Sequence, residues 1–286
     1  MEIKPVPKII ETIEKLIQEE KYEDAYAFGL ENIDLNKEYL PGEYAFKNIL
    51  EEYIFQVFIK GEIKRKYPLM LDYSSLYTYY GISLLKMSKF EDSRKSLNLA
   101  LKYNPINVNA LLALAEIERD ENPERYLKIS LDCARYSYSL ENLAKSFRNL
   151  SDYYLNKKDN FSDEDMKIAS SLFILSKEYD AESKNAISEL ADLEEKLDLD
   201  SISQFKSDDR YDILKIREYL KSRNLPHEAS IEIITICKTL GFQLDEAKKV
   251  VPALFYFNIA YELSGDSNIK ETIDILNEKI ERKANE

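Results

Sequence analysis

The sequence predicts an all-α protein, and two features of its 286 residues carry this prediction. Only 6 Gly and 8 Pro interrupt a chain of which 44% is hydrophobic and 33% charged, a composition typical of helical proteins rather than of turn-rich β folds. Hydrophobic residues also recur at helical spacing, as in the stripe Ile9, Ile13 and Leu16 of a helix expected over 7–19.

Local signals predict the next elements. Residues 21–25, Lys-Tyr-Glu-Asp-Ala, have the character of a turn that opens a second helix, and Pro41-Gly42 ends this hairpin. A strongly apolar helix is expected over 43–60. Gly61, the basic run 64–66 and then Pro68 separate it from the next helix.

Residues 74–107 carry the clearest pattern, and the residues that define it are Tyr77, Tyr80, Gly81, Leu84, Ser93, Leu97, Ala100 and Pro105. Numbered from Ser74, they fall at positions 4, 7, 8, 11, 20, 24, 27 and 32 of a 34-residue unit. This spacing resembles the tetratricopeptide repeat (TPR), in which small residues at positions 8, 20 and 27 let two antiparallel helices approach closely.

Other stretches have the same pattern. The unit at 108–141 has Leu111, Leu114, Ala115, Leu131 and Ala134 at repeat positions, and the unit at 234–267 has Leu240, Gly241, Ala253, Phe257 and Ala260. A less regular unit includes Ser151 and Ala169, whose wider separation predicts an enlarged turn over 157–163. Ser162 and the acids after it are suited to cap the following helix.

The resemblance implies an α-solenoid, a TPR-like right-handed superhelix of antiparallel helix pairs with a C-terminal capping helix near 268–282. About 12 to 14 helices are expected. We predict a solenoid over 1–200 and a C-terminal helical segment over 201–286, which contains the unit at 234–267. The acidic stretch 198–209 is the expected linker. Ordinary helical hairpins are the alternative interpretation. The chain is also similar to uncharacterised multi-repeat TPR proteins of bacteria.

Charge and composition exclude several functions. The net charge of −13 weighs against binding nucleic acid or an anionic membrane surface, because both are driven by clustered Lys and Arg. No stretch has the roughly 18 apolar residues of a membrane span, and residues 1–18 do not resemble a signal peptide. Cys133 and Cys237 lie in apolar helical patterns, so we expect buried, reduced thiols and a cytoplasmic protein.

Catalysis is not expected either. His227 is the single histidine of the sequence, and the two cysteines are far apart, so the usual zinc ligand patterns are absent. The glycines are too scattered for a phosphate-binding loop. Paired carboxylates such as Asp208-Asp209 are explained by solvated loops. We therefore expect no enzyme activity, no cofactor and no metal.

The resemblance also indicates which residues face the concave groove, because positions 2, 5, 9, 12 and 13 of the first helices line it in a TPR stack. The groove positions that we select as candidates for binding a partner are the cations Lys86, Arg119, Lys145 and Arg148 and the apolar residues Ile82, Leu85 and Leu112. Such cations are suited to capture carboxylates of an acidic peptide. Hydrated charges balanced by Glu116, Asp120 and Asp152 are the alternative. One TPR class binds the C-terminal carboxylates of chaperones through defined residues at groove positions. Among the residues at these positions in this sequence, only Lys145 matches that class.

The sequence leaves two functional hypotheses. The first is a non-catalytic protein–protein interaction scaffold or adaptor that binds a peptide or helix in the groove along 74–160. The second is a structural or self-assembling protein whose groove is occupied by its own C-terminal segment or by a second copy, as in a homodimer. The sequence does not identify the partner.

Overall fold

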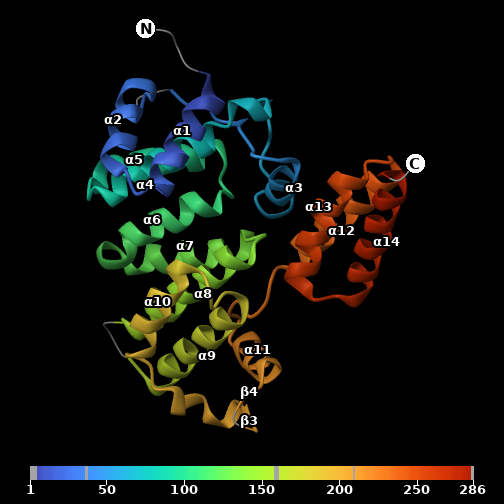
Figure 1. The fold of residues 1–286 in the computed structure, drawn as a ribbon. Coiled ribbons are helices and arrows are strands. Elements are labelled where there is room, and N and C mark those ends of the chain that lie inside the picture. The colour runs from blue at the N-terminus through green and yellow to red at the C-terminus, as the bar shows by residue number, and fades with distance from the viewer. Residues whose placement is uncertain (1–4, 36–37, 158–160, 209, 285–286) are drawn as a thin grey trace. The chain divides into compact units, whose positions relative to one another are not determined.

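The computed structural model describes residues 5–35, 38–157, 161–208 and 210–284. These residues form fourteen α-helices, two 3₁₀ helices and four strands of two residues each (Figure 1). The prediction of an all-α protein is confirmed. None of the helices in the described ranges is both long enough and apolar enough to cross a membrane.

The chain divides into two compact units, residues 1–132 and 133–286, and the division falls within helix α7 (Pro123–Tyr136). It therefore differs from the expected boundary at 200/201. The expected linker is a packed part of the second unit, because its 3₁₀ helix η2 (Leu199–Phe205) lies against α9 (Asp163–Tyr179). The Ile202 side chain is fully buried there. Asp209 lies outside the described residues.

The first unit is built from helical hairpins and an inserted segment. Its elements are α1 (Val6–Gln18), α2 (Tyr22–Asn32), β1 (Glu43–Tyr44), α3 (Ile49–Phe58), β2 (Arg65–Lys66), η1 (Leu69–Leu71), α4 (Tyr73–Lys86), α5 (Phe90–Tyr103), α6 (Val108–Glu121) and the beginning of α7. Helix α4 packs against both α1 and α2, and α6 packs against both α4 and α5. Each new hairpin therefore begins with a helix that contacts both helices of the hairpin before it.

The same turn joins three hairpins, α1–α2, α4–α5 and the later α12–α13. Glu20, Ser88 and Lys248 adopt left-handed φ angles of 59°, 57° and 60°. In each turn the next residue is a lysine, which is the N-cap of the second helix. The backbone N–H of this lysine donates a hydrogen bond to the carbonyl of the residue five positions before it. The three hairpins therefore close with the same left-handed turn, which also ends α11 at Asn224, where φ is 57°.

Close approach between paired helices occurs at the predicted small residues. A Cβ atom added to Gly81 would lie 2.7 Å from Cδ2 of Leu97, and one added to Gly241 would lie 2.8 Å from the Phe257 ring. Both pairs correspond to repeat positions 8 and 24. Most other predicted repeat positions are also buried, namely Tyr77, Tyr80, Leu84, Ser93, Ala100, Leu111, Leu114, Ala115, Ala134, Leu240, Ala253 and Ala260, while Leu131 is half-buried. Pro105 is half-buried just after α5.

The segment between α2 and α4 differs from its prediction. The expected helix over 43–60 begins only at Ile49, because Glu43–Tyr44 pairs in parallel with Arg65–Lys66 as a short two-stranded sheet. The Tyr44 ring then packs against Phe55, with 4.5 Å between ring centroids. Aromatic packing and strand pairing therefore replace the first turns of the expected helix.

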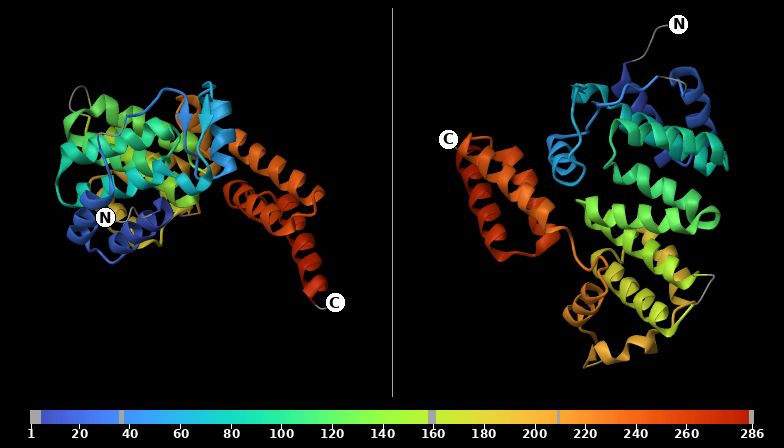
Figure 2. Two further views of the ribbon diagram at one scale, coloured as in Figure 1. Left: turned by 90° about the horizontal axis from the view of Figure 1, so that it is seen from above. Right: turned by 180° about the vertical axis from the view of Figure 1, so that it is seen from behind.

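The second unit contains, after the end of α7, α8 (Leu140–Leu155), α9, α10 (Lys184–Glu194), η2, β3 (Lys206–Ser207), β4 (Arg210–Tyr211), α11 (Ile213–Ser222), α12 (Ile231–Glu246), α13 (Val250–Ser264) and α14 (Ser267–Ala284). Helix α8 pairs with α9, and α10 contacts both; α12 pairs with α13, against which α14 packs (Figure 2). Pro252 lies in the first turn of α13, where its missing N–H disturbs no helical hydrogen bond.

The α8–α9 pair confirms the predicted small positions despite their wider separation. The Ser151 hydroxyl donates to the carbonyl of Ala169 at 2.8 Å, across the two helices. Ser162 and Asp165 form a capping box at the start of α9, as the acidic run there predicted. The expected enlarged turn includes residues 158–160, which lie outside the described residues.

Candidate functional site

The groove positions of α4 do not form a fully exposed surface. Lys86 is exposed and Ile82 is half-buried, but Leu85 is buried, with 6% of its surface exposed. The expectation of Leu85 as an exposed apolar anchor is therefore wrong. Leu84, which precedes it, is buried as well, so Leu85 contributes to packing.

Thr78, another groove position of α4, belongs to a buried polar network. Asn107, which caps α6, donates through Nδ2 to the hydroxyls of Ser74 at 2.8 Å and Thr78 at 3.1 Å. Its Oδ1 accepts the backbone N–H of Ala110 at 3.2 Å. These bonds join adjacent first helices and leave Thr78 no role in contacting a partner.

The candidate residues of α6 are more accessible. Leu112 is half-buried and Arg119 is exposed, with Asp120 3.8 Å away as its ion-pair neighbour. Glu116 pairs with Lys86 of α4 at 3.4 Å, and the two side chains are 50% and 42% exposed. Exposed pairs of this kind contribute little to stability. They keep one cation and one acid close together on neighbouring first helices.

An ion-pair network around one buried acid of the same unit has no counterpart in the sequence predictions. Glu118 of α6 is buried, and its Oε1 lies 3.1 Å from Nε of Arg94 on α5 and 3.1 Å from Nη1 of Arg125 on α7. The acid and its two cations come from three successive helices, which this network links. Sequence spacing gives no signal for it, because the partners are on different helices.

In the second unit, one carboxylate from elsewhere in the chain pairs with both candidate cations. Glu189 of α10 pairs with Lys145 of α8, and its Oε2 lies 2.7 Å from Nε of Arg148. Lys145 and Arg148 lie on one face of α8 at helical spacing, and α10 packs against this helix. The structure therefore brings these two predicted residues together, and Glu189 is the functional candidate that sequence analysis missed.

Arg148 is buried to an unusual degree for a predicted groove residue, with 3% of its side chain exposed. Its Nη2 is 3.8 Å from Asp180, beyond hydrogen-bond distance, and Nη1 is buried without a hydrogen-bond partner. The expectation of an exposed Arg148 is wrong, because α10 and the residues before it cover the guanidinium. A buried donor without a partner costs about 1–3 kcal/mol.

Across the described residues, no three His, Cys, Asp or Glu side chains are placed to hold a metal ion. His227 Nδ1 lies 2.9 Å from the carbonyl of Leu225, in a local contact just before α12. Cys133 and Cys237 are buried, as predicted, and no disulfide joins them; burial raises the pKa of Cys237 to about 12.

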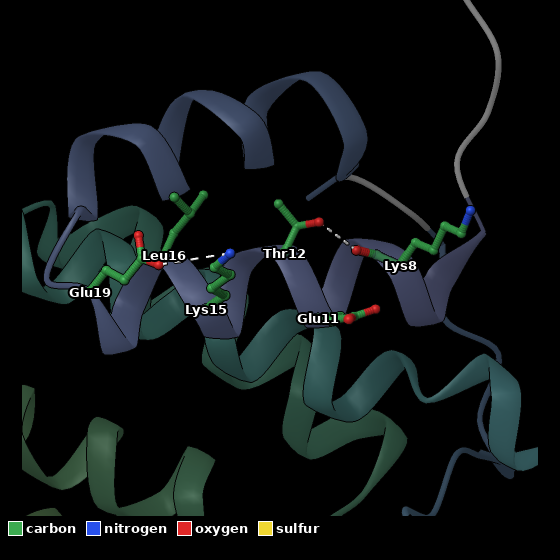
Figure 3. A pocket seen from close by; sticks show the side chains of 6 residues that line it. All are labelled: Lys8, Glu11, Thr12, Lys15, Leu16 and Glu19. Carbon is green, nitrogen blue, oxygen red and sulfur yellow. Dashed lines mark hydrogen bonds and ion pairs between the residues drawn. The ribbon is translucent and has the colours of Figure 1, made fainter.

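A shallow hollow on α1 is lined by one face of a single helix. Figure 3 shows its side chains, among them Lys15 and Glu19, which form an ion pair at 3.9 Å. The Thr12 hydroxyl donates to the carbonyl of Lys8 at 2.8 Å, within the same helix. These contacts are local to α1, and nothing in them selects a ligand.

Comparison with models of protein families gives no match, and comparison with characterised protein sequences gives no relative. The repeat assignment therefore depends on the agreement among the hairpins of the chain itself.

Proposed function

We propose that this protein is a non-catalytic interaction scaffold of the TPR type, which binds an acidic peptide or helix on the groove-facing side of its first helices. The observation that carries the proposal is the position of Glu189. One carboxylate, presented by a short helix, lies between Lys145 and Arg148 at two groove positions of α8. This contact is an example, within the chain, of the recognition that we assign to the groove.

Helix α10 also indicates what kind of ligand suits this face. Its Ala186, Leu190 and Leu193 side chains are buried, and the Glu189 carboxylate lies beside them. Ile187 is exposed on the other side. The pattern describes an amphipathic helix with apolar residues at i, i+4 and i+7 and an acid next to them, which is a common mode of helix recognition.

The first unit offers open groove positions of similar chemistry. On α4 and α6, Ile82 and Leu112 are half-buried, and Lys86 and Arg119 are exposed. If the stacking of α1, α2, α4, α5 and α6 continues as a right-handed superhelix, these four side chains line its concave face. The partner that we propose for this face is a protein or peptide, and we propose neither nucleic acid nor a membrane. Two buried thiols suit the reducing cytoplasm.

The second candidate function is a structural protein whose groove is filled permanently by its own segment. The position of α10 on α8 favours it specifically, because the face that would take a partner is already covered. The two candidates differ in whether α10 can be exchanged for another helix.

Whether α10 can be exchanged for another helix can be tested with a peptide that has the sequence of α10. A fluorescent peptide of residues 181–197 is titrated with the full chain, either wild type or Glu189→Lys. In the variant a third positive charge lies next to Lys145 and Arg148, so α10 should leave this face of α8. The wild-type peptide should then bind the variant at least tenfold more tightly than it binds the wild-type chain. The matched control is Glu194→Lys, which makes the same charge change in an exposed pair with Lys177 at 3.7 Å.

The control should leave peptide affinity unchanged. Hydrogen exchange provides the second readout, since amides of α10 should lose protection in Glu189→Lys and keep it in Glu194→Lys. A folded Glu189→Lys chain that binds the peptide no better than wild type would contradict the scaffold proposal and favour the structural one.

A further inference from the structure

Helix α3, in the inserted segment of the first unit, has two apolar faces. Leu50, Ile54 and Phe55 are buried on one side. Ile49, Tyr53 and Val57 lie at intervals of four residues on an adjoining, outward-facing side, and they are 46%, 42% and 38% exposed. We call these three residues the α3 stripe. Successive apolar residues on one exposed helix face mark an interaction site more often than an ordinary surface.

The inserted segment holds the orientation of α3 by several bonds. Asn48 accepts the backbone N–H of Glu51 at 3.0 Å and so caps the helix. The buried Glu51 carboxylate accepts the N–H of Lys47 at 2.7 Å and Nδ2 of Asn104 at 2.8 Å, which ties α3 to the end of α5. The backbone N–H of Ala45 donates to the carbonyl of Tyr103 at 2.9 Å. These contacts hold one face of α3 inward and the stripe outward.

Lysines outnumber acids around the stripe: Lys47, Lys60 and Lys66 are exposed there, against the exposed Glu62 and the half-buried Glu52. In α3, which the structure describes completely, Glu52 is the acid that shares the exposed side, and Lys66 pairs with it at 2.7 Å. The exposed residues Lys47 and Lys60 lie just before and just after the helix. A positive border on a chain of net charge −13 is complementary to an acidic partner.

We propose that the α3 stripe is a second docking surface, separate from the groove, and that its occupant is an acidic amphipathic helix of another protein. Apolar residues of that helix would cover Ile49, Tyr53 and Val57. Carboxylates roughly 15–20 Å apart along it would meet Lys47 and Lys60, given a rise of about 1.5 Å per residue. Pairing of two α3 helices is disfavoured, because it would bring the lysines of both copies together.

The size of the surface sets the expected strength of binding. A helix of 10 residues is roughly 15 Å long, so the interface is smaller than that of a stable complex. We therefore expect a transient interaction with a dissociation constant in the micromolar range. Its charged border should make it weaker at high salt, because exposed charges are screened within about 10 Å at 0.1 M.

The test uses a labelled model peptide and the full chain. The probe is a helical peptide of about 20 residues with Leu at positions i, i+4 and i+8 and with Glu before the first and after the last of these Leu residues. A second probe has Lys in place of these Glu residues. Binding is followed by fluorescence anisotropy. The acidic peptide should bind in the micromolar range, Tyr53→Asp should weaken it at least tenfold, and the basic peptide should bind at least tenfold less well.

Two further variants make the outcome decisive. Lys47→Glu with Lys60→Glu should reverse the preference in favour of the basic peptide, which a loss of folding would not produce. Ile187→Asp on α10, at a residue that is 59% exposed, is the control for adding an acid to an exposed apolar site and should leave binding unchanged.

The proposal is overturned if the acidic peptide does not bind or binds Tyr53→Asp equally well while circular dichroism shows a folded chain. A wild-type dimer in sedimentation that Tyr53→Asp dissociates would also overturn it, and would assign the stripe to a second copy. Stripe-dependent binding to anionic vesicles without binding to the acidic peptide would assign it to a lipid surface instead.

Discussion

In each of the hairpins α4–α5 and α8–α9, a serine hydroxyl forms a hydrogen bond between the two helices, but the serine lies on a different helix in each. In α4–α5, Ser93 at repeat position 20 donates its hydroxyl to the carbonyl of Gly81 at position 8, at 2.7 Å. In α8–α9 the direction is reversed, and Ser151 at position 8 donates to Ala169 at position 20, at 2.8 Å. The close approach of the helices is therefore the constant feature, and either helix can supply the hydroxyl.

The second helices of these two hairpins, α5 and α9, also begin differently. Helix α5 comes after a tight turn, and Lys89 at its N-cap makes no side-chain cap. Helix α9 comes after a longer connection and begins with the capping box of Ser162 and Asp165. A tight hairpin turn brings the helix start into position through the backbone, whereas a helix after a longer connection depends on its own side chains.

The largest effect is expected where α4 and α5 have no room for a side chain. Gly81→Leu should lower the free energy of unfolding by about 3 kcal/mol, because the new atoms would collide with Leu97. Ala100→Leu, at a fully buried position, should cost about 1–3 kcal/mol. Denaturant midpoints measure both, with the exposed Ile187→Leu as the control. An unchanged midpoint for Gly81→Leu would show that these helices do not approach here.

The capping box should make α9, and not α5, sensitive to acid. Burial alone would raise the pKa of Asp165, but hydrogen bonds from Ser162 and Lys157 outweigh it, so the pKa is lowered. Asp165→Ala should cost about 1 kcal/mol at pH 7. This contribution is complete above the unfolded pKa of roughly 4 and is lost as the pH falls through the lower folded pKa.

Urea unfolding at pH 7 and pH 3 tests this, with Lys89→Ala as the control at the uncapped start of α5. The difference between wild type and Asp165→Ala should shrink at the lower pH. A difference of the same size at both values would mean that the carboxylate charge is not what stabilises the helix start.

The reversed hydroxyl bonds should be equivalent in energy. Ser93→Ala and Ser151→Ala each remove one buried hydrogen bond, so each should lower the free energy of unfolding by about 1 kcal/mol. Chemical denaturation of the two variants measures the comparison. If one substitution is neutral and the other is costly, the two positions are not structurally equivalent despite their geometry.

The smallest effect is expected in the tight turn. Ser88 has a φ of 57°, a conformation that costs a non-glycine residue energy, so Ser88→Gly should stabilise the chain by about 0.5 kcal/mol after the larger entropy of the unfolded glycine is included. Lys248→Gly should act similarly in α12–α13. A rise in melting temperature is expected for both; a fall would mean that the side chain makes a stabilising contact.

Much of the hairpin structure could be predicted from the sequence, because local spacing determines it. Repeat spacing identifies Gly81 and Gly241 as close-approach positions, and the structure places Leu97 and Phe257 against them. Hydrophobic periodicity predicts the burial of Cys133 and Cys237 in the same way. These are properties of one helix or one hairpin, and helical spacing contains the information they require.

Contacts between distant segments could not be predicted in this way. Repeat position assigns Lys145 and Arg148 to the groove, but no spacing rule connects them with Glu189, which reaches them only because α10 packs against α8. Similarly, the apolar pattern over 43–60 is consistent with one long helix, whereas Tyr44 lies in a strand paired with β2. Tertiary packing decides both outcomes.

The inserted segment between α2 and α4 has a consequence for how such a chain can change. Closing a connection of about 40 residues instead of about 4 costs roughly 2 kcal/mol of entropy, since each doubling of loop length adds only about 0.6 kcal/mol. The aromatic cluster around Phe55 offsets a cost of this size, and α4 still packs against α1 and α2. A junction between hairpins can therefore accept a new element at little thermodynamic cost, which makes it a place where a new surface can evolve without disturbing the stack.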